Sequence, residues 1–196
     1  FILKYLIEEV LKLQPENIRH FLLRTAFLDK FCPELCNAIL GIENSDELIQ
    51  ECIKSNLFVI SLDDQQIWFR YHHLFADLLS MYLEKEYTEK EICQLHMKAS
   101  HWYQETANFE QAITYAINGK AYQQAAELIE QIVDRVIARG QVKTLMKWIG
   151  EIPEEIIVSR PRLLLHQGWV VFLTGNVTAA SKILHAGKSA LALLPE

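Results

Sequence analysis

The sequence predicts a mainly α-helical protein, with a winged-helix domain that carries one short β-hairpin, followed by an α-solenoid of tetratricopeptide-like helix pairs. Three observations predict this fold. Apolar residues recur at helical spacing along most of the chain. The period changes to a strand-like alternation near residues 57–71. Gly140 and Gly175 stand 35 residues apart, close to the tetratricopeptide period of about 34.

The N-terminal part is expected to begin with a helix over residues 1–13, whose apolar side chains share one stripe. Pro15 ends this helix and suits the first turn of the next one, which carries the apolar residues of 18–26. Pro33 opens a short helix that Gly41 ends, because glycine is favoured just past a helix C-terminus.

A third short helix is expected after Ser45, whose hydroxyl suits an N-cap. Residues 57–60 and 67–71 then read as two strands joined by the polar turn 63–66, which is typical of a β-hairpin. A long helix from about His73 to Glu86 follows. Three helices, a hairpin and a helix is the order of a winged-helix domain.

Beyond this domain the whole chain is expected to be helical. Helices are expected to begin at Phe109, Tyr122 and Val177, each with the same pattern of a large residue, any two residues and an alanine. The small alanine lets neighbouring helices approach closely. The last pair is expected at 163–173 and 177–194. Stacked pairs of this kind form an α-solenoid.

The composition excludes several classes of protein. The chain has 196 residues, of which 51% are hydrophobic, with seven glycines and five prolines, so it is neither collagen-like nor a disordered tail. No apolar run reaches 18 residues, so no transmembrane helix and no membrane partner are expected. The chain begins at Phe1 inside a helical pattern and ends at Glu196, so we expect a piece of a longer protein. The four cysteines indicate reduced thiols in the cytoplasm.

Charge argues against DNA binding by the winged helix. Residues 1–87 hold 14 acidic and 8 basic residues, a net charge of −6. The third helix, which would enter the major groove, carries Asp46, Glu47 and Glu51 against Lys54. Because DNA affinity requires lysine and arginine at the phosphates, no direct nucleic-acid contact is expected.

Enzyme and metal signals are weak. The chain has none of the common glycine-rich phosphate-binding or nucleophile motifs, so no catalytic residue and no enzyme activity are predicted for it. Cys32 and Cys36 are four residues apart, but no second pair has zinc-finger spacing, which favours buried thiols over a metal site. His96 and His101 are five apart and diverge on a helix, so no metal ligand is predicted.

His72 and His73 are the candidate binding residues. They lie where the second strand meets the following helix, and the unpaired N–H groups of a helix N-terminus attract anions. An imidazole there can donate to a phosphate. The alternative is that His72 caps the helix or fills the corner of the hairpin, and the residue types alone favour this second interpretation.

The string Tyr71-His72-His73-Leu74-Phe75-Ala76-Asp77-Leu78-Leu79 strongly resembles the large ATP-dependent, LuxR-family transcriptional activators of the MalT type. These belong to the signal-transducing ATPases with numerous domains. Further segments share the resemblance, which spans almost the whole chain: 15–29, 56–58, 62–64, 101–103, 109–113, 125–129, 160–163, Trp169 and 174–175.

The resemblance implies a regulatory function. The order of that family is an ATPase core, a winged helix, a helical arm, a repeat sensor and a DNA-binding helix-turn-helix. It implies that His72, with His73 as the second choice, contacts the β-phosphate of ADP and holds a resting state. Exchange for ATP and inducer binding would then release the winged helix and allow self-assembly. Mapped on this chain, the regions are the end of an upstream helical region at 1–14, the winged helix at 15–87, the arm at 88–159 and the start of the sensor at 160–196.

The implied partners are an upstream ATPase core of the same chain, an unknown inducer or protein on the helical repeats, and further copies of the protein. ADP or ATP with Mg²⁺ would bind in the full-length protein, with no cofactor held by this piece alone. The runner-up function is a tetratricopeptide-like interaction scaffold, and the third is a DNA-binding winged helix. Trp148, Trp169, Tyr103 and Tyr115 could line an inducer groove, although aromatic residues at helical spacing are mostly core.

Overall fold

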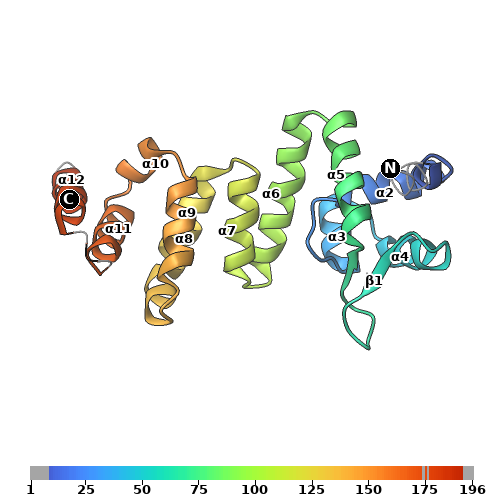
Figure 1. Ribbon diagram of the computed structural model, residues 1–196, viewed down its shortest axis with the longest axis horizontal. Helices are drawn as coiled ribbons and strands as arrows, with labels where there is room; N and C mark the ends of the chain where they lie inside the picture. Colours follow the sequence, from blue (N-terminus) through green and yellow to red (C-terminus); the bar gives the residue numbers. More distant parts are fainter. Residues whose placement is uncertain (1–8, 174, 176, 192–196) are drawn as a thin grey trace. The chain divides into compact units, whose positions relative to one another are not determined.

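A computed structural model describes residues 9–173, 175 and 177–191 of the chain (Figure 1). The chain divides into two compact units, Phe1–Trp102 and Tyr103–Glu196. Most of the predicted first helix lies outside the described residues, and its described part is helical at 9–12. The fold class is confirmed: the described chain is mainly α-helical and contains one short antiparallel hairpin.

The first unit contains the predicted succession of three helices, a hairpin and a helix (Figure 1). Its elements are α2 (Glu16–Thr25), α3 (Pro33–Leu40), α4 (Ser45–Lys54), β1 (Val59–Ser61), β2 (Phe69–Tyr71) and α5 (His73–Glu86), followed by α6 (Glu89–Glu105), in which the unit ends.

The short helix α3 begins and ends as predicted. Pro33 is its first residue, and Gly41 follows it with φ 71°, a left-handed conformation that glycine adopts without strain. The predicted cap of α4 was wrong by one residue. Asn44 is the N-cap, and Ser45 is the first helical residue, buried, with its N–H donating to Asn37 Oδ1 at 3.0 Å. Packing of Ser45 into the core prevents its hydroxyl from capping the helix.

The hairpin pairs Val59 with Tyr71 and Ser61 with Phe69. Phe31, in the connection between α2 and α3, adds an isolated bridge to Phe69, with both backbone hydrogen bonds at 2.8 Å. Phe69 and Tyr71 are buried while Arg70, between them, is exposed, as the two-residue period of a strand requires. This alternation directs Arg70 away from the core.

The buried side of the hairpin packs into an aromatic cluster. The Tyr71 ring lies 4.7 Å from the Phe31 ring and 5.9 Å from the Phe75 ring, measured between centroids. Phe21 of α2 meets Phe31 edge-on at 6.4 Å. Since these rings come from α2, β2, α5 and the connection after α2, the cluster fixes the start of α5 against the rest of the unit.

Asp63 organises the turn of the hairpin. Its carboxylate accepts from the N–H of Ile67 at 3.0 Å and from that of Trp68 at 2.7 Å, and its carbonyl accepts from the Ser61 hydroxyl. These hydrogen bonds lower the pKa of the Asp63 carboxyl, because they favour its charged form. Asp63 therefore stabilises the hairpin in addition to adding a negative charge to its turn.

A pH titration of the hairpin checks this role. Because the pKa of Asp63 is lower in the folded hairpin than in the unfolded chain, its stabilisation is complete above the unfolded value and is lost as the pH falls through the folded one. We expect the Ile67 and Trp68 amide signals in an NMR titration to report this loss. In Asp63→Asn the acid-induced change should disappear, whereas Asp64→Asn should leave it in place.

Helix α6 begins with a capping box. The Glu91 carboxylate accepts from the Thr88 N–H at 2.8 Å and from its hydroxyl at 2.7 Å, while the Thr88 hydroxyl accepts from the Glu91 N–H. Further along α6, Lys98 donates to the Ile39 carbonyl at 2.9 Å, at the C-terminal end of α3. The contact between Lys98 and Ile39 thus packs α6 against the first unit. The predicted domain limits 1–14, 15–87, 88–159 and 160–196 stay predictions.

The second unit consists of successive helices. They are α7 (Phe109–Asn118), α8 (Tyr122–Ala138), α9 (Val142–Glu151), α10 (Glu154–Val158), α11 (Pro161–Leu173) and α12 (Val177–Leu191). In Figure 1, α7, α8 and α9 lie side by side, and they contact one another. The alanines of the predicted pattern, Ala112, Ala125 and Ala180, are buried. The predicted final residues of the last helix, 192–194, lie outside the described part.

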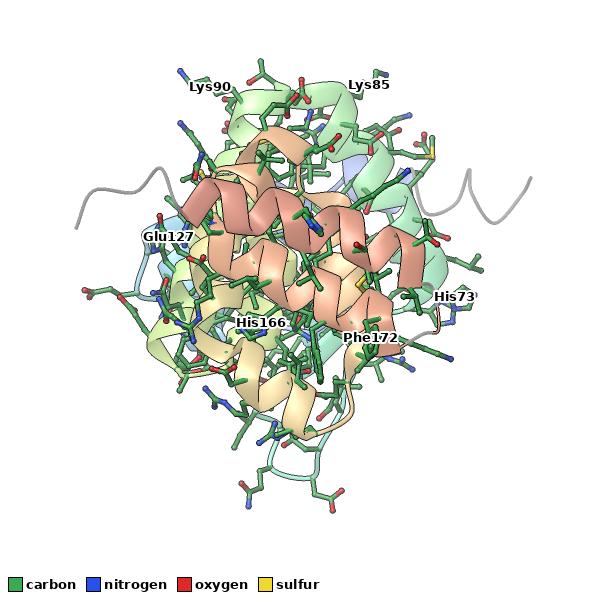
Figure 2. The ribbon with its side chains drawn as sticks, turned by 90° about the vertical axis from the view of Figure 1, so that its left-hand side faces the viewer. His73, Lys85, Lys90, Glu127, His166 and Phe172 are labelled. Atoms are coloured by element: carbon green, nitrogen blue, oxygen red, sulfur yellow. The ribbon has the colours of Figure 1, made fainter. Side chains whose placement is uncertain are left out.

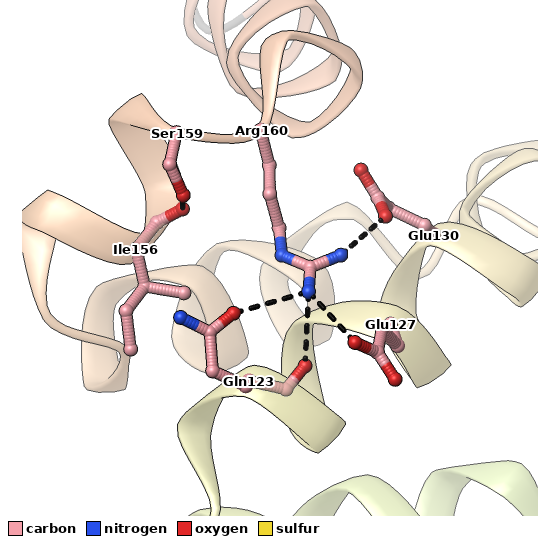
Figure 3. Close-up of polar contacts among 6 residues, drawn as sticks. All are labelled: Gln123, Glu127, Glu130, Ile156, Ser159 and Arg160. Atoms are coloured by element: carbon pink, nitrogen blue, oxygen red, sulfur yellow. Dashed lines mark hydrogen bonds and ion pairs between the residues drawn. The ribbon is translucent and has the colours of Figure 1, made fainter.

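Arg160 joins the end of α10 to α8 (Figure 3). Its Nη1 donates to Glu130 at 2.8 Å, and its Nη2 donates to Glu127 at 2.9 Å and to the Gln123 side chain at 3.1 Å. The Arg160 side chain is only 18% exposed. The fork of this guanidinium, placed just before Pro161, fixes where α11 begins. Among the described residues, no helix combines the length and the apolar character that a membrane crossing requires.

Candidate functional site

The junction between β2 and α5 holds both candidate histidines. The His72 N–H donates to the Phe58 carbonyl at 2.8 Å, and the His72 carbonyl accepts from Phe75 and Ala76 at 2.8 and 2.9 Å. His72 is the N-cap residue of α5, but its side chain makes no capping hydrogen bond. The alternative interpretation is therefore confirmed for the position of His72 at the N-cap but not for a side-chain cap, and the His72 side chain is half-buried.

Phe58 reaches its position through an unusual backbone conformation. Its φ is 55°, in the left-handed region that bulky residues rarely adopt, and its ring packs on Phe75 at 5.3 Å. Such a conformation costs on the order of 1–3 kcal/mol and persists only where the surroundings fix it. Here it directs the Phe58 carbonyl at the His72 N–H, which fixes the direction in which the chain enters α5.

A groove of about 460 Å³ lies at this junction. Its walls come from the connection after α2, from the hairpin and from the first two turns of α5: Ala26, Phe27, Leu28, Asp29, Ile60, Arg70, Tyr71, His72, His73, Ala76, Asp77 and Ser80. The structure thus brings His72 and His73 to one groove, with ring centroids 4.4 Å apart. His73 is exposed and projects outward from the ribbon (Figure 2).

The groove has charges of both signs. Arg70 adds a guanidinium beside the two imidazoles, while Asp29 and Asp77 contribute carboxylates. The first N–H groups of α5 are at the same place and have no acceptor within the helix. This arrangement can bind an anion through Arg70, a histidine and the helix N-terminus, and the carboxylates limit how much negative charge it accepts.

Sequence reasoning missed Arg70, Asp29 and Asp77. Arg70 carried a usable signal, because it lies two residues before His72 in an alternating strand whose other face is aromatic. Asp29 carried none, since it reaches the groove only through the packing of the connection after α2 against the hairpin.

Tyr71 anchors the wall of the groove. Its hydroxyl lies 2.7 Å from the Thr25 hydroxyl, which also lies 2.7 Å from the Phe21 carbonyl, and both side chains are buried. Burial raises the pKa of Tyr71 well above its ordinary value, so the phenol stays protonated. This contact ties the strand that carries Arg70 to the end of α2.

The remaining candidates lie in the core or apart from one another. Cys32, Cys36 and Cys52 are buried, and burial raises the pKa of the Cys32 thiol to about 11 and that of Cys52 to about 12. His96 packs against Phe27 at 4.4 Å, and burial lowers its pKa to about 4, whereas His101 is exposed.

Of the four aromatic residues considered for an inducer groove, three are buried in the core and one is exposed. Trp148, Tyr103 and Tyr115 are buried, the two tyrosines with parallel rings 5.4 Å apart. Trp169 is 50% exposed and stacks on Phe172 at 5.9 Å.

Comparison with known proteins identifies the family. Residues 7–91 match the MalT winged helix domain. A serine/threonine-protein kinase PknK of Mycobacterium tuberculosis is 30% identical over 195 residues, 98% of this chain and 18% of that protein. The HTH-type transcriptional regulators MalT of Vibrio parahaemolyticus and Vibrio campbellii are 29% and 28% identical, over 85% and 92% of this chain and 18% and 20% of theirs.

The chain thus spans about a fifth of the length of these curated relatives. The match to the winged-helix family covers the three helices, the hairpin and α5, including the groove residues described above. Residues 7–91 are a MalT winged-helix domain, and most of the chain is similar to MalT regulators.

Proposed function

We propose that this chain is the regulatory segment of an ATP-dependent transcriptional regulator of the LuxR family, a cytoplasmic signal-transducing ATPase. The observation that carries the proposal is the groove at the β2–α5 junction, which Arg70, His72 and His73 line together. Two relatives of this chain have names that describe transcriptional regulators. The third relative is named as a kinase, a different activity, so the shared part is better suited to control than to catalysis.

In this proposal His72 donates a hydrogen bond to the β-phosphate of ADP bound, with Mg²⁺, by an ATPase core elsewhere in the same protein. Arg70 supplies a second donor. ATP brings further negative charge, which Asp29 and Asp77 oppose, so the groove favours ADP over ATP. The winged helix then closes on the ADP-bound core and leaves it when ATP enters. The chain itself hydrolyses nothing.

The second unit acts in this proposal as a tetratricopeptide-like sensor. Inducer binding to its helices adds to the effect of ATP, and the released protein associates with further copies to activate transcription. The chain makes no direct contact with nucleic acid, because α4 and the turn of the hairpin expose acidic side chains at Asp46, Glu47, Glu51 and Asp64.

A scaffold function is the second candidate. The exposed pair Trp169 and Phe172 on α11 favours it, because exposed stacked aromatic residues are frequent at protein–protein contacts. A scaffold needs no nucleotide, which separates the two functions.

Thermal unfolding of the longer protein, with its ATPase core, distinguishes them. The switch predicts that ADP raises the melting temperatures of both the winged helix and the core. ATP should raise the melting temperature of the core alone. A scaffold predicts that neither nucleotide changes the melting of the part described here. Equal melting in ADP, in ATP and without nucleotide would contradict the proposed switch.

A further inference from the structure

A second groove lies within the helical unit, between the α9–α10 segment and the α11–α12 pair. Its volume is about 490 Å³, within the range of roughly 300–1,000 Å³ typical of small-molecule sites. Six aliphatic side chains line it: Ile149, Ile152, Ile157, Val158, Leu164 and Ile183. Its polar lining residues are Glu154, Gln167 and Lys182.

The apolar part forms a floor with an open side. Ile149 and Leu164 are only 2% and 4% exposed, so they belong to the core and present one surface to the groove. Val158, in contrast, is 45% exposed although it is large and aliphatic. At Gly150 an added Cβ would meet no atom within 4 Å, so this wall is unobstructed. A ligand with an apolar group would cover Val158 and remove that surface from water.

The three polar side chains of this groove have no partner in the described part of the chain. Among the described residues, the side chains of Glu154, Gln167 and Lys182 make no hydrogen bond and no ion pair. Lys147 and Glu151, on the same segment, do pair with each other at 3.9 Å. A positive group, a negative group and an amide therefore line one apolar groove without neutralising one another.

This combination selects the chemistry of a ligand. A simple carboxylate would be attracted by Lys182 and repelled by Glu154. A simple amine would be attracted by Glu154 and repelled by Lys182. A molecule with both charges and an apolar body satisfies all three polar groups. We propose that the groove binds a small apolar zwitterion, a free amino acid such as leucine. Lys182 and Gln167 donate to its carboxylate, Glu154 accepts from its ammonium group, and the aliphatic floor holds its side chain.

This site goes beyond the proposed nucleotide switch and does not depend on it, because all the lining residues belong to the second unit. Calorimetric titration of the 196-residue chain with L-leucine, L-isoleucine and L-phenylalanine tests it. Three comparators each lack one feature: 4-methylpentanoate has no ammonium group, isoamylamine has no carboxylate, and L-serine has no apolar side chain. We expect saturable binding of at least one of the three amino acids and at least about tenfold weaker binding of every comparator.

Paired variants locate the site. Lys182→Gln and Glu154→Gln should each weaken binding by about tenfold or more, because each removes a charged hydrogen-bond partner. Lys143→Gln and Glu155→Gln change exposed neighbours that do not line the groove, and they should bind as the unchanged chain does. Circular dichroism confirms that all four variants fold. No binding of any of the three amino acids, or unchanged binding by Lys182→Gln and Glu154→Gln, would overturn the proposal.

Discussion

Replacing Gly168 by alanine is expected to destabilise the chain by about 1–3 kcal/mol, the usual consequence of overpacking a core. Gly168 lies inside α11, where alanine would otherwise be favoured by about 1 kcal/mol. A Cβ at this position would lie 2.7 Å from both Cγ and Cδ2 of Leu184 on α12, closer than carbon atoms can approach. The Leu184 side chain packs against the backbone of α11 at Gly168. To accommodate the added Cβ, Leu184 or the whole of α12 must move.

Gly150→Ala is the matched control. Gly150 also lies in a helix, in the last turn of α9, but an added Cβ there has no atom within 4 Å. This substitution should stabilise the chain by up to about 1 kcal/mol, because only the helix propensity changes. Urea unfolding of the two variants measures the change in the free energy of unfolding, which should be a loss for Gly168→Ala and a gain for Gly150→Ala. If Gly168→Ala were as stable as Gly150→Ala, the described packing of α11 on α12 would be wrong.

Replacing Arg160 by alanine is expected to lower the free energy of unfolding by about 1–3 kcal/mol. The substitution removes a forked contact and leaves Glu130, whose side chain is 22% exposed, without its cation (Figure 3). Arg160→Lys should recover only part of the loss, because an ammonium group cannot reproduce the planar fork.

Arg162 provides the control two residues away. It pairs with Asp134 at 3.0 Å, but both side chains are largely exposed, at 58% and 72%. Exposed pairs contribute at most about 1 kcal/mol and often nothing measurable, so Arg162→Ala should change stability far less than Arg160→Ala. Chemical denaturation of both variants at neutral pH compares them, and equal effects would show that the Arg160 contact is an ordinary surface pair.

Most of the fold could be predicted because its signals are local. Phe69 and Tyr71 alternate with Arg70, and Gly41 follows an apolar helix, so strand and helix limits are contained in a few neighbouring residues. Ser45 shows where local reasoning fails: its hydroxyl suits a cap, but tertiary packing buries it and Asn44 takes that place.

The candidate site could be predicted only in part. The pairing of His72 with a helix start is a local feature, and the sequence contains it. Which charges surround the histidines depends on how the connection after α2 packs on the hairpin, so Asp29 could not be assigned to the groove. The apolar groove near Lys182 was likewise absent from the sequence reasoning, because its walls come from four separate segments.

The affinity of the longer protein for ADP, compared between the unchanged protein, His72→Ala and His73→Ala, tests the central claim most directly. A hydrogen bond to a charged partner contributes roughly 1.5–3 kcal/mol. We therefore predict that His72→Ala weakens ADP binding by about tenfold or more and raises activation without inducer, and that His73→Ala does less. The melting temperature of the isolated 196-residue chain should not change in either variant. An unchanged ADP affinity for His72→Ala, together with a lower melting temperature of the chain, would show that His72 only packs the hairpin corner and would contradict the switch.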